Sequence, residues 1–568
     1  MSRVGLLVIF LSVSTSLFGQ SSDQPISISF ENETLENALL ELDKVVERQL
    51  SYNPQILPTG VVVNQSFEGQ SPENVLTAIL GSAYQLKNIG DYIIIQKVPL
   101  VKKEKSTFQL TGGIKDAATG LDLEDVSIYE INSLQSTLSD KLGEFSLKSE
   151  TNLATATFVI SKRFYEDTII QVSNLEPYVA PIVLKKEEQT KPRIAIRERV
   201  RTFSSGLAKF FTSDKVRTNA SNVNFVDTRM FQFSLVPAIG TNRKLSSQIK
   251  NKASLNLIAG YTYGVDGVEI GGVYNISRGE VWGVQVGGFG NTVGGEVHGL
   301  QMGGFINTSK DYVKGAQIAG FINVASDSVN GFQMGGFTNL TREMSGIQVA
   351  GFNNHTKRMN GFQLSGFINT TQEMDGFQLT GFINIAKEVK GLQLSVINVS
   401  DTVASGIPFG LFNIVKKNGF ISPAIESDDL VPYRLAFRSG LEKFYTVLSA
   451  GIDPDDHWTF GAGFGSRLFP LKEKKFFLNP ELRWINAAEG SGNQNENNTI
   501  IRFGFNLGYQ LFKHLSITTG PTLNYYYTNH LDESQDPVIS LARNPIVDEV
   551  SGKFRHQLWI GYSIGIGF

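Results

Sequence analysis

The chain reads GFQLSGFINTTQEMDGFQLTGFIN from Gly361 to Asn384, two copies of a phrase that recurs ten times between Gly267 and Asn413. Each copy runs through Gly, an apolar residue, Gln, a second apolar residue, a small residue, Gly, Phe, a variable residue and Asn, with some departures. The spacing is 16 residues at first and 15 afterwards. A unit this short cannot bury its own apolar side chains, so successive units must pack on one another. The copies begin at Gly267, Gly283, Gly299, Gly315, Gly331, Gly346, Gly361, Gly376, Gly391 and Gly406.

The alternation within each copy predicts a β-strand, and the polar residues after each Asn predict a turn. In a parallel solenoid, equal positions would stack about 4.8 Å apart into ladders of Gln, Asn and Phe. In an antiparallel meander, the natural repeat would be a hairpin of about 30 residues. The repeat over 267–413 favours the solenoid but leaves the meander open. Glu269 and Pro408 replace Gln in the outermost copies, as expected of capping repeats.

Composition limits the possible functions. The chain has 568 residues, enough for several domains, and a net charge of −3, which gives no reason to expect nucleic-acid binding. It has no cysteine, so disulfides, thiolate metal sites and a cysteine nucleophile are excluded. Its 56 glycines and 39 phenylalanines, with only 18% charged residues, suit closely packed β structure with tight turns.

The N-terminal segment resembles a secretory signal in its layout. Residues 1–19 contain Arg3 and a largely apolar stretch from Val4 to Leu11, with cleavage expected near Gly19. Further along the chain, no run of about 18 apolar residues follows. We therefore expect an exported protein that can span a membrane only as a β-barrel.

Residues 21–100 predict a small α+β domain. Thr34 caps a helix with apolar residues at helical spacing, SPENVLTAILGSA predicts a second helix, and YQLKNIGDYIIIQK predicts a hairpin around Gly90. This segment resembles the secretin and TonB N-terminal short domain, through its LENALLEL helix, the turn SYNPQIL, the second helix and the final hairpin. The resemblance implies a periplasmic domain that docks a protein partner in the periplasm or inner membrane. A spacer that binds nothing is the alternative.

Residues 107–186 alternate apolar and polar side chains without a helical signal. GGIKDAATGLDLEDVSIYE followed by STLSDKLGEFSL resembles the carboxypeptidase regulatory-like β-sandwich. The resemblance implies an accessory module without peptidase chemistry. It rests on six residues, most of which form turns: Asp116, Thr119, Gly120, Asp140, Gly143 and Phe145.

A basic segment separates these domains from the repeats. Lys185 to Arg217 holds ten Lys and Arg against four acids, and IAIRERVRTFSSGLAKFF could form an amphipathic helix beside a membrane. A solvated linker over 187–230 is the simpler interpretation. Leading strands are expected in 231–266, where FQFSLVPAI and SLNLIAGYTYG precede the first copy.

Residues 420–568 predict seven or eight further strands. The last, LWIGYSIGIGF, alternates apolar residues with polar or small ones and ends on Phe568. It resembles the terminal strand of bacterial outer-membrane barrels, and aromatic residues such as Trp458 and Trp484 suit interfacial girdles. Either these strands and the leading strands close a barrel of 8 to 10 strands, or the repeats join them in one larger barrel.

No motif for catalysis is present in the sequence. The six histidines lack metal-ligand spacing, and no GxSxG, Walker A or paired-carboxylate pattern occurs. Asp453, Asp455, Asp456 and His457 could hold calcium, but an interstrand turn explains them better. We therefore nominate no catalytic, cofactor-binding or metal residue, and we expect neither an enzyme nor a cofactor.

The sequence thus predicts a mainly β, multidomain protein: a small α+β domain, a β-sandwich, a β-repeat region that is solenoid or barrel meander, and an antiparallel outer-membrane-type β-barrel. We expect a non-enzymatic outer-membrane protein with periplasmic domains, in contact with outer-membrane lipid and serving envelope signalling or surface binding. One alternative is a secreted or surface solenoid that binds glycan or protein. Another is an outer-membrane transport protein, although no plug domain is recognised between Lys185 and Phe231.

Overall fold

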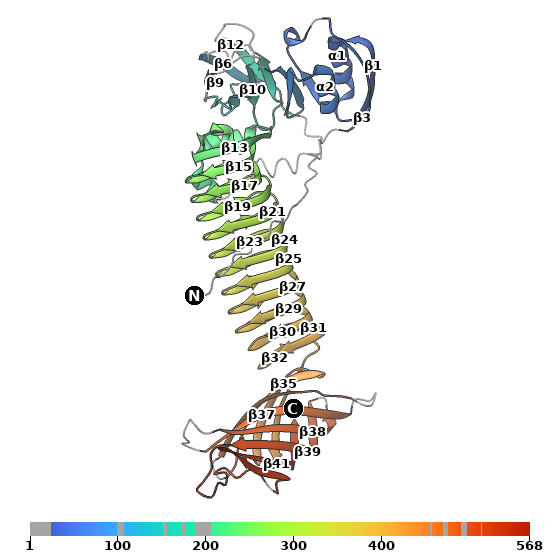
Figure 1. The fold of residues 1–568 in the computed structure, drawn as a ribbon, viewed down its shortest axis with the longest axis vertical. Coiled ribbons are helices and arrows are strands. Elements are labelled where there is room, and N and C mark those ends of the chain that lie inside the picture. The colour runs from blue at the N-terminus through green and yellow to red at the C-terminus, as the bar shows by residue number, and fades with distance from the viewer. Residues whose placement is uncertain are drawn as a thin grey trace, which may run out of the picture. The chain divides into compact units, whose positions relative to one another are not determined.

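The computed structural model shows a mainly β chain that divides into two compact units (Figure 1). The first comprises Met1–Thr202, Thr212–Thr228 and Asn242–Lys250, and the second comprises Phe203–Phe211, Arg229–Thr241 and Asn251–Phe568. The signal segment 1–19 and most of the basic segment lie outside the described residues. The described residues are 24–58, 60–98, 107–150, 156–171, 178–187, 206–454, 457–469, 475–489, 497–512, 514–542 and 544–568.

The first part of the first unit is a small α+β fold that contains both predicted helices. Thr34 caps the first helix by accepting a hydrogen bond from the Asn37 backbone N–H at 3.3 Å, and Ser71 caps the second through Asn74 in the same way. Leu39, Leu42 and other apolar side chains of the helices pack against the strands. The elements are β1 (Ile26–Thr34), α1 (Leu35–Val45), β2 (Gln49–Ser51), η1 (Pro54–Ile56), β3 (Val62–Gln70), α2 (Pro72–Leu80), β4 (Tyr84–Ile89) and β5 (Tyr92–Lys97).

The second part of this unit consists of two small sheets around a shared apolar core. One sheet has the order β12-β6-β9 and the other β11-β10-β7-β8. Asp116 ends β6 and fixes the turn that follows, because its carboxylate accepts hydrogen bonds from the backbone N–H groups of Ala118 and Thr119. The strands are β6 (Phe108–Asp116), β7 (Ser127–Glu130), β8 (Ser136–Leu138), β9 (Glu144–Ser149), β10 (Thr157–Ser161), β11 (Thr168–Gln171) and β12 (Tyr178–Leu184).

The segment predicted as a linker, 187–230, is not solvated throughout. Its described part forms α4 (Gly206–Phe211) and α5 (Asp214–Asn222). In α5, Asn219 is buried and accepts a hydrogen bond from the Ser127 hydroxyl at 2.7 Å, and Asn222 donates to the Asp125 carbonyl at 2.6 Å. Buried amides with specific partners hold this helix in the first unit. The linker interpretation is therefore wrong for α5; residues 188–205 lie outside the described part.

The repeats form a parallel β-solenoid, so the solenoid prediction is confirmed and the meander is wrong. Each coil pairs in parallel and in register with the next: Gly361 lies opposite Gly376, and Gln363 opposite Gln378. The same register holds from Gly267 to Gly406. The stacked rungs appear in green to orange in Figure 1.

The leading strands also belong to this sheet, which corrects their assignment to a barrel. FQFSLVPAI contains the end of β13 and the first residue of β14, and SLNLIAGYTYG contains the end of β15, all of β16 and the first residue of β17. η3 (Arg243–Gln248) stands between them. The twenty strands are β13 (Asp227–Val236), β14 (Ile239–Gly240), β15 (Ile249–Asn256), β16 (Ala259–Thr262), β17 (Gly264–Gly271), β18 (Tyr274–Ser277), β19 (Val281–Gly287), β20 (Gly290–Val293), β21 (Val297–Gly303), β22 (Ile306–Ser309), β23 (Val313–Ala319), β24 (Ile322–Gly335), β25 (Thr338–Ala350), β26 (Asn353–His355), β27 (Arg358–Ser365), β28 (Ile368–Thr370), β29 (Glu373–Thr380), β30 (Ile383–Leu394), β31 (Ile397–Phe409) and β32 (Phe412–Val415).

The solenoid interior is filled by two kinds of side chain. Gln and Asn of each coil are buried and form ladders, and a third column of Val and Met forms the apolar core. The repeated Phe does not share this interior. From Phe289 to Phe382 the ring column lies outside, with each side chain 38–43% exposed.

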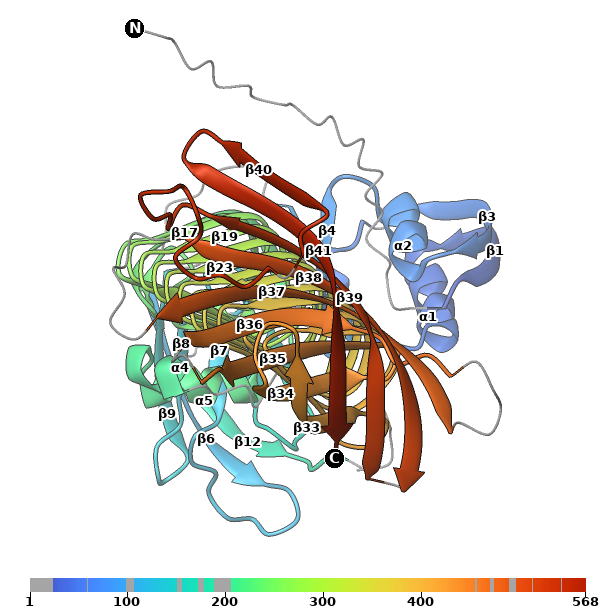
Figure 2. The same ribbon diagram turned by 90° about the horizontal axis from the view of Figure 1, so that it is seen from below.

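The C-terminal strands form a separate antiparallel sheet, shown in brown to red in Figure 2. Eight of its described strands form a closed ring, because the first, β33, pairs with β41 as well as with β34. All eight follow the repeats, so neither the leading strands nor the repeats contribute to the closure. The strands are β33 (Phe420–Asp428), β34 (Tyr433–Leu441), β35 (Phe444–Ile452), β36 (His457–Gly465), β37 (Phe476–Glu489), β38 (Asn498–Phe512), β39 (Leu515–Thr528) and β41 (Phe554–Gly567), with β40 (Val547–Ser551) paired to β41.

Deleting one complete coil, Gly361 to Asp375, should leave a folded solenoid. The deletion joins equal positions of neighbouring coils, so every ladder continues with one rung fewer. We expect a fall in Tm of about 2–4 °C, the shift that roughly 1 kcal/mol produces in a domain of 150–250 residues. Circular dichroism during heating measures it. Deleting only Gly361 to Phe367 breaks the register and should abolish the cooperative transition; equal Tm values for both deletions would contradict the prediction.

Candidate functional site

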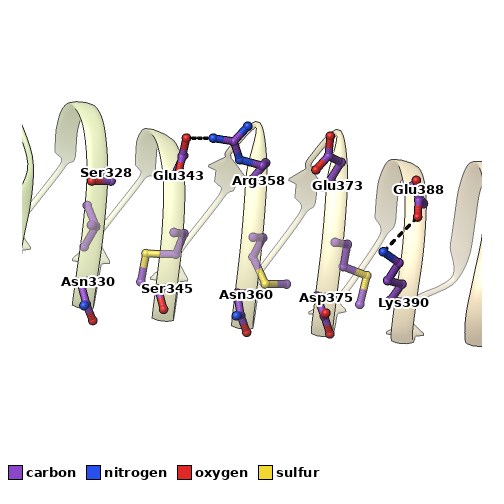
Figure 3. Close-up of a pocket in the computed structure, with 14 residues that line it drawn as sticks. Ser328, Asn330, Glu343, Ser345, Arg358, Asn360, Glu373, Asp375, Glu388 and Lys390 are labelled. Carbon is purple, nitrogen blue, oxygen red and sulfur yellow. Dashed lines mark hydrogen bonds and ion pairs between the residues drawn. The ribbon is translucent and has the colours of Figure 1, made fainter.

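A groove of about 490 Å³ crosses five coils of the solenoid, from β24 to β30 (Figure 3). In-register pairing places equal positions of these coils in the same column. Two columns of polar side chains border the groove, and buried Val329, Met344, Met359 and Met374 come between them in sequence. One column is Ser328, Glu343, Arg358, Glu373 and Glu388, and the other is Asn330, Ser345, Asn360, Asp375 and Lys390.

The charges in this groove are only partly paired. Glu343 pairs with Arg358, and Glu388 with Lys390 at 3.3 Å, as the dashed lines in Figure 3 show. Between them, exposed Glu373 and Asp375 belong to one coil and make no ion pair within the described part of the chain. The groove therefore offers free carboxylates beside amide and hydroxyl groups. Such groups can hydrogen-bond a long polar ligand that crosses several coils.

Beneath this surface, the two amide ladders run in opposite directions. Along the Gln ladder each side chain donates to the preceding coil, as Gln363 does to Gln348 at 2.8 Å. Along the Asn ladder each donates to the following coil, as Asn354 does to Asn369 at 3.0 Å. Every coil is thereby bonded to both neighbours through its interior, which holds the columns of the groove in register.

Glu269 ends the Gln ladder at the first coil. Its carboxylate accepts hydrogen bonds from the Gln285 side chain at 2.7 Å and from the Asn256 side chain at 2.9 Å. The carboxylate thus replaces the Gln side-chain oxygen that would otherwise accept from Gln285. Glu269 is fully buried, and burial raises its pKa although these hydrogen bonds act in the opposite direction. At the other end Pro408 cannot donate, which leaves the Gln393 side-chain oxygen without a partner.

Replacing Glu269 by Gln should change how stability depends on pH. Because its pKa is raised on folding, Glu269 contributes stability below its unfolded pKa and loses it as pH rises through the folded pKa. Gln does not titrate. The Tm of Glu269→Gln minus that of the wild type should therefore increase from pH 4 to pH 9. Scanning calorimetry across this range measures it, and a constant difference would exclude a raised pKa.

The residues considered for metal binding do not form a site in the described chain. The Asp453 carboxylate accepts hydrogen bonds from the backbone and ring nitrogens of His457 at 2.9 and 2.8 Å, which closes the turn before β36. Asp455 and Asp456 lie outside the described residues. Elsewhere in the described part, no group of three or more His, Asp and Glu side chains is placed to hold a metal ion.

Sequence reasoning missed the groove because its residues look like turn residues. A signal was present: they stand three and one positions before the opening Gly of each coil, as Glu373 and Asp375 do before Gly376.

Comparisons with protein-family models, curated proteins and solved structures give no match to this chain. Among the described residues no helix is long and apolar enough to cross a membrane.

Proposed function

We propose that this chain is a non-enzymatic outer-membrane protein, anchored in lipid by its closed C-terminal sheet and carrying a solenoid that binds partners. The observation that carries the proposal is the inverted polarity of the closed sheet. Within the ring of eight strands, charged side chains such as Arg483 and Glu481 are buried while a band of large apolar side chains is exposed, an arrangement unlike that of a water-soluble fold.

Part of the interior of the closed sheet is a network of ion pairs, beside a buried apolar cluster that includes Tyr526 and Trp559. Arg483 bonds the carboxylates of Glu426 and Glu481, at 2.7 Å to Glu426, and Arg438 bonds the same two carboxylates. Among the described residues of this network, four acidic and four basic side chains are buried, so their charges balance. They are Glu426, Asp428, Asp429, Glu481, Arg434, Arg438, Arg483 and Arg502.

The outer surface of the sheet is apolar along most strands. From Phe503 to Leu511 on β38 and from Ile560 to Ile566 on β41, every second side chain is large, apolar and exposed. Exposing an apolar band around a closed sheet to water is unfavourable, whereas contact with lipid chains is favourable. Closure also leaves no unpaired strand edge within the membrane. The band includes Ile421, Ile425, Leu435, Phe460, Trp484, Phe503, Phe505, Leu507, Ile517, Leu523, Ile560, Tyr562, Ile564 and Ile566.

The filled interior favours an anchor over a channel. The cavity beside Glu426, Glu481, Arg483 and Arg502 encloses about 10 Å³, the space of a single water at most. Closed sheets of eight strands are commonly filled by their own side chains. Transport through this sheet is therefore the less favoured function.

Fractionation and gel migration test the anchor. We expect the protein in the outer-membrane fraction, released by detergent but not by high salt or carbonate. An unboiled sample should migrate differently from a boiled one, because a closed sheet in detergent resists unfolding. Recovery in the soluble fraction after mild lysis, with equal migration of boiled and unboiled samples, would overturn the proposal.

For the solenoid we propose glycan binding in the groove. The unpaired Glu373 and Asp375, flanked by Asn360 and Ser345, favour it. Binding to a panel of soluble oligosaccharides should weaken at least tenfold in the double variant Glu373→Gln, Asp375→Asn, a loss of about 1.4 kcal/mol. The control Asp311→Asn, on a coil outside the groove, should bind as the wild type does. No binding to any member, or equal loss in both variants, would exclude the groove.

The sequence resemblances supply the proposed role of the N-terminal domains. We propose that residues 21–100 and 107–186 lie in the periplasm and that the first of them docks a protein partner. Their support is the motifs quoted above and the two capped helices, α1 and α2. Envelope signalling is the function that such docking would serve.

A further inference from the structure

One face of the solenoid is apolar without exception. It is formed by the two residues that flank the Gln position of each coil, for example Phe332 and Met334 beside Gln333. All twenty such residues, over ten coils, are apolar. Between the opening Gly and the Asn of each coil the sole charged residue is Glu269, and its side chain is buried. We call this surface the apolar face.

The apolar face is periodic. Its side chains stand on in-register parallel strands, so each column repeats at the strand spacing. Phe362 and Phe377 stack with ring centroids 5.0 Å apart and an interplanar angle of 5°. The exposed Phe column runs along one border, where neighbouring rings such as Phe337 and Phe352 lie 4.9 Å apart. The rings form a regular ridge beside the two columns.

We propose that the apolar face binds the same face of a second copy of this chain. With strands about 4.8 Å apart and about 3.3 Å per residue, the three positions from one flanking residue to the other, over ten coils, span about 43 by 10 Å, or about 430 Å². That area matches the largest apolar patches of monomers, about 300–600 Å², which are often functional, and is about half of the roughly 800 Å² that each partner buries in a standard complex. A second copy supplies the matching period along the whole length, and two uncharged faces do not repel.

The charge around the face favours a second copy over a lipid surface. Arg278 to Lys417 contains ten Lys and Arg and nine Asp and Glu, so no basic excess borders the face. Surfaces that dock on anionic lipid carry such an excess, because each basic residue near the membrane adds to the attraction. A balanced rim instead suits pairing of identical copies.

Single cysteines test the proposal in the full-length chain, which has no cysteine of its own. Met334 and Ile347 are 45% and 46% exposed at the centre of the face, and Ile270 and Ile407 lie near its ends. Each is replaced by Cys, and intact cells are treated with a disulfide-forming oxidant or a short bismaleimide. Ser345→Cys, equally central but in the polar column, is the control. We expect most chains to form a cross-linked dimer at the central positions and a background level at Ser345.

The end positions distinguish the two symmetric arrangements. In an antiparallel pair only central residues meet their own copies, so Ile270→Cys and Ile407→Cys remain monomeric. In a parallel pair all four positions cross-link. Monomer at every position, products of another mass, or equal cross-linking at Ser345 would overturn the proposal.

A disruptive variant gives an independent result. Met334→Lys combined with Ile347→Lys places two charges at the centre of the face, while both side chains remain in solvent in a single copy. Co-purification of two differently tagged chains should fall at least tenfold, with an unchanged Tm of the solenoid. Ser345→Lys should leave co-purification unchanged. Undiminished co-purification in the double variant would also refute the pairing.

Discussion

Gly376→Ala should destabilise the solenoid by about 3 kcal/mol or more, because a backbone conformation open essentially to glycine alone and a steric overlap act together. Gly376 has φ +133°, and a Cβ built there would overlap the carbonyl oxygen of Gly361 in the preceding coil. The coil cannot move away without breaking the ladders on both sides. All ten opening glycines share this geometry, with φ between +118° and +147°.

Chemical denaturation followed by circular dichroism measures this effect. Asp375→Ala, one residue earlier and exposed, is the matched control and should change the free energy of unfolding by less than about 0.5 kcal/mol. If Gly376→Ala were as stable as Asp375→Ala, the close stacking of the coils at this column would be refuted.

Arg483→Met should prevent the closed sheet from reaching its folded state. Arg483 is bonded to Glu426 and Glu481, and all three side chains are buried. Removing one partner of a buried ion pair leaves an uncompensated charge and costs about 3–5 kcal/mol. We expect unboiled and boiled samples of the variant to migrate alike on gels. We also expect a low yield of the variant in the membrane fraction.

A second substitution should restore the variant in part. Arg483→Met combined with Glu481→Gln removes the excess negative charge, and neutral replacements of buried ion pairs are often tolerated. The double variant should therefore regain the heat-modifiable form. If Arg483→Met alone assembled normally, or if the double variant assembled no better, the charge network would not govern folding of the sheet.

The period of 15 or 16 residues was enough to favour a solenoid. A repeat of that length, with Gly and Gln at fixed positions, fits coils in which identical residues stack, whereas a meander would repeat by the hairpin. The position of Phe could not be predicted by alternation. Counting by twos from Gln363 places both Phe367 and Asn369 inside. The chain bends at Gly366 and Phe367, so Phe turns outward while Asn returns to the interior.

The C-terminal sheet shows a similar limit. Alternation in LWIGYSIGIGF indicated an amphipathic strand, but the partners inside the sheet lie far apart in sequence. Arg483 meets Glu426 across 57 residues, and the contact depends on the register of several strand pairs. The groove depends on register in the same way, since Glu373 and Asp375 gain neighbours only when the coils stack.

The ladders make the solenoid a cross-β stack of fixed length. Rows of identical Gln, Asn and Phe at the strand spacing are the features that let amyloid fibrils grow by adding chains to an open end. Here the last Asn of the stack, Asn413, donates its backbone N–H to Ser439 and its side chain to Thr446 of the closed sheet. Pro408 offers no donor to Gln393, and Glu269 closes the other end of the Gln row. A repeat with the composition of an amyloid fibril is therefore limited to a fixed number of coils, because neither ladder ends in a row that a further chain could extend.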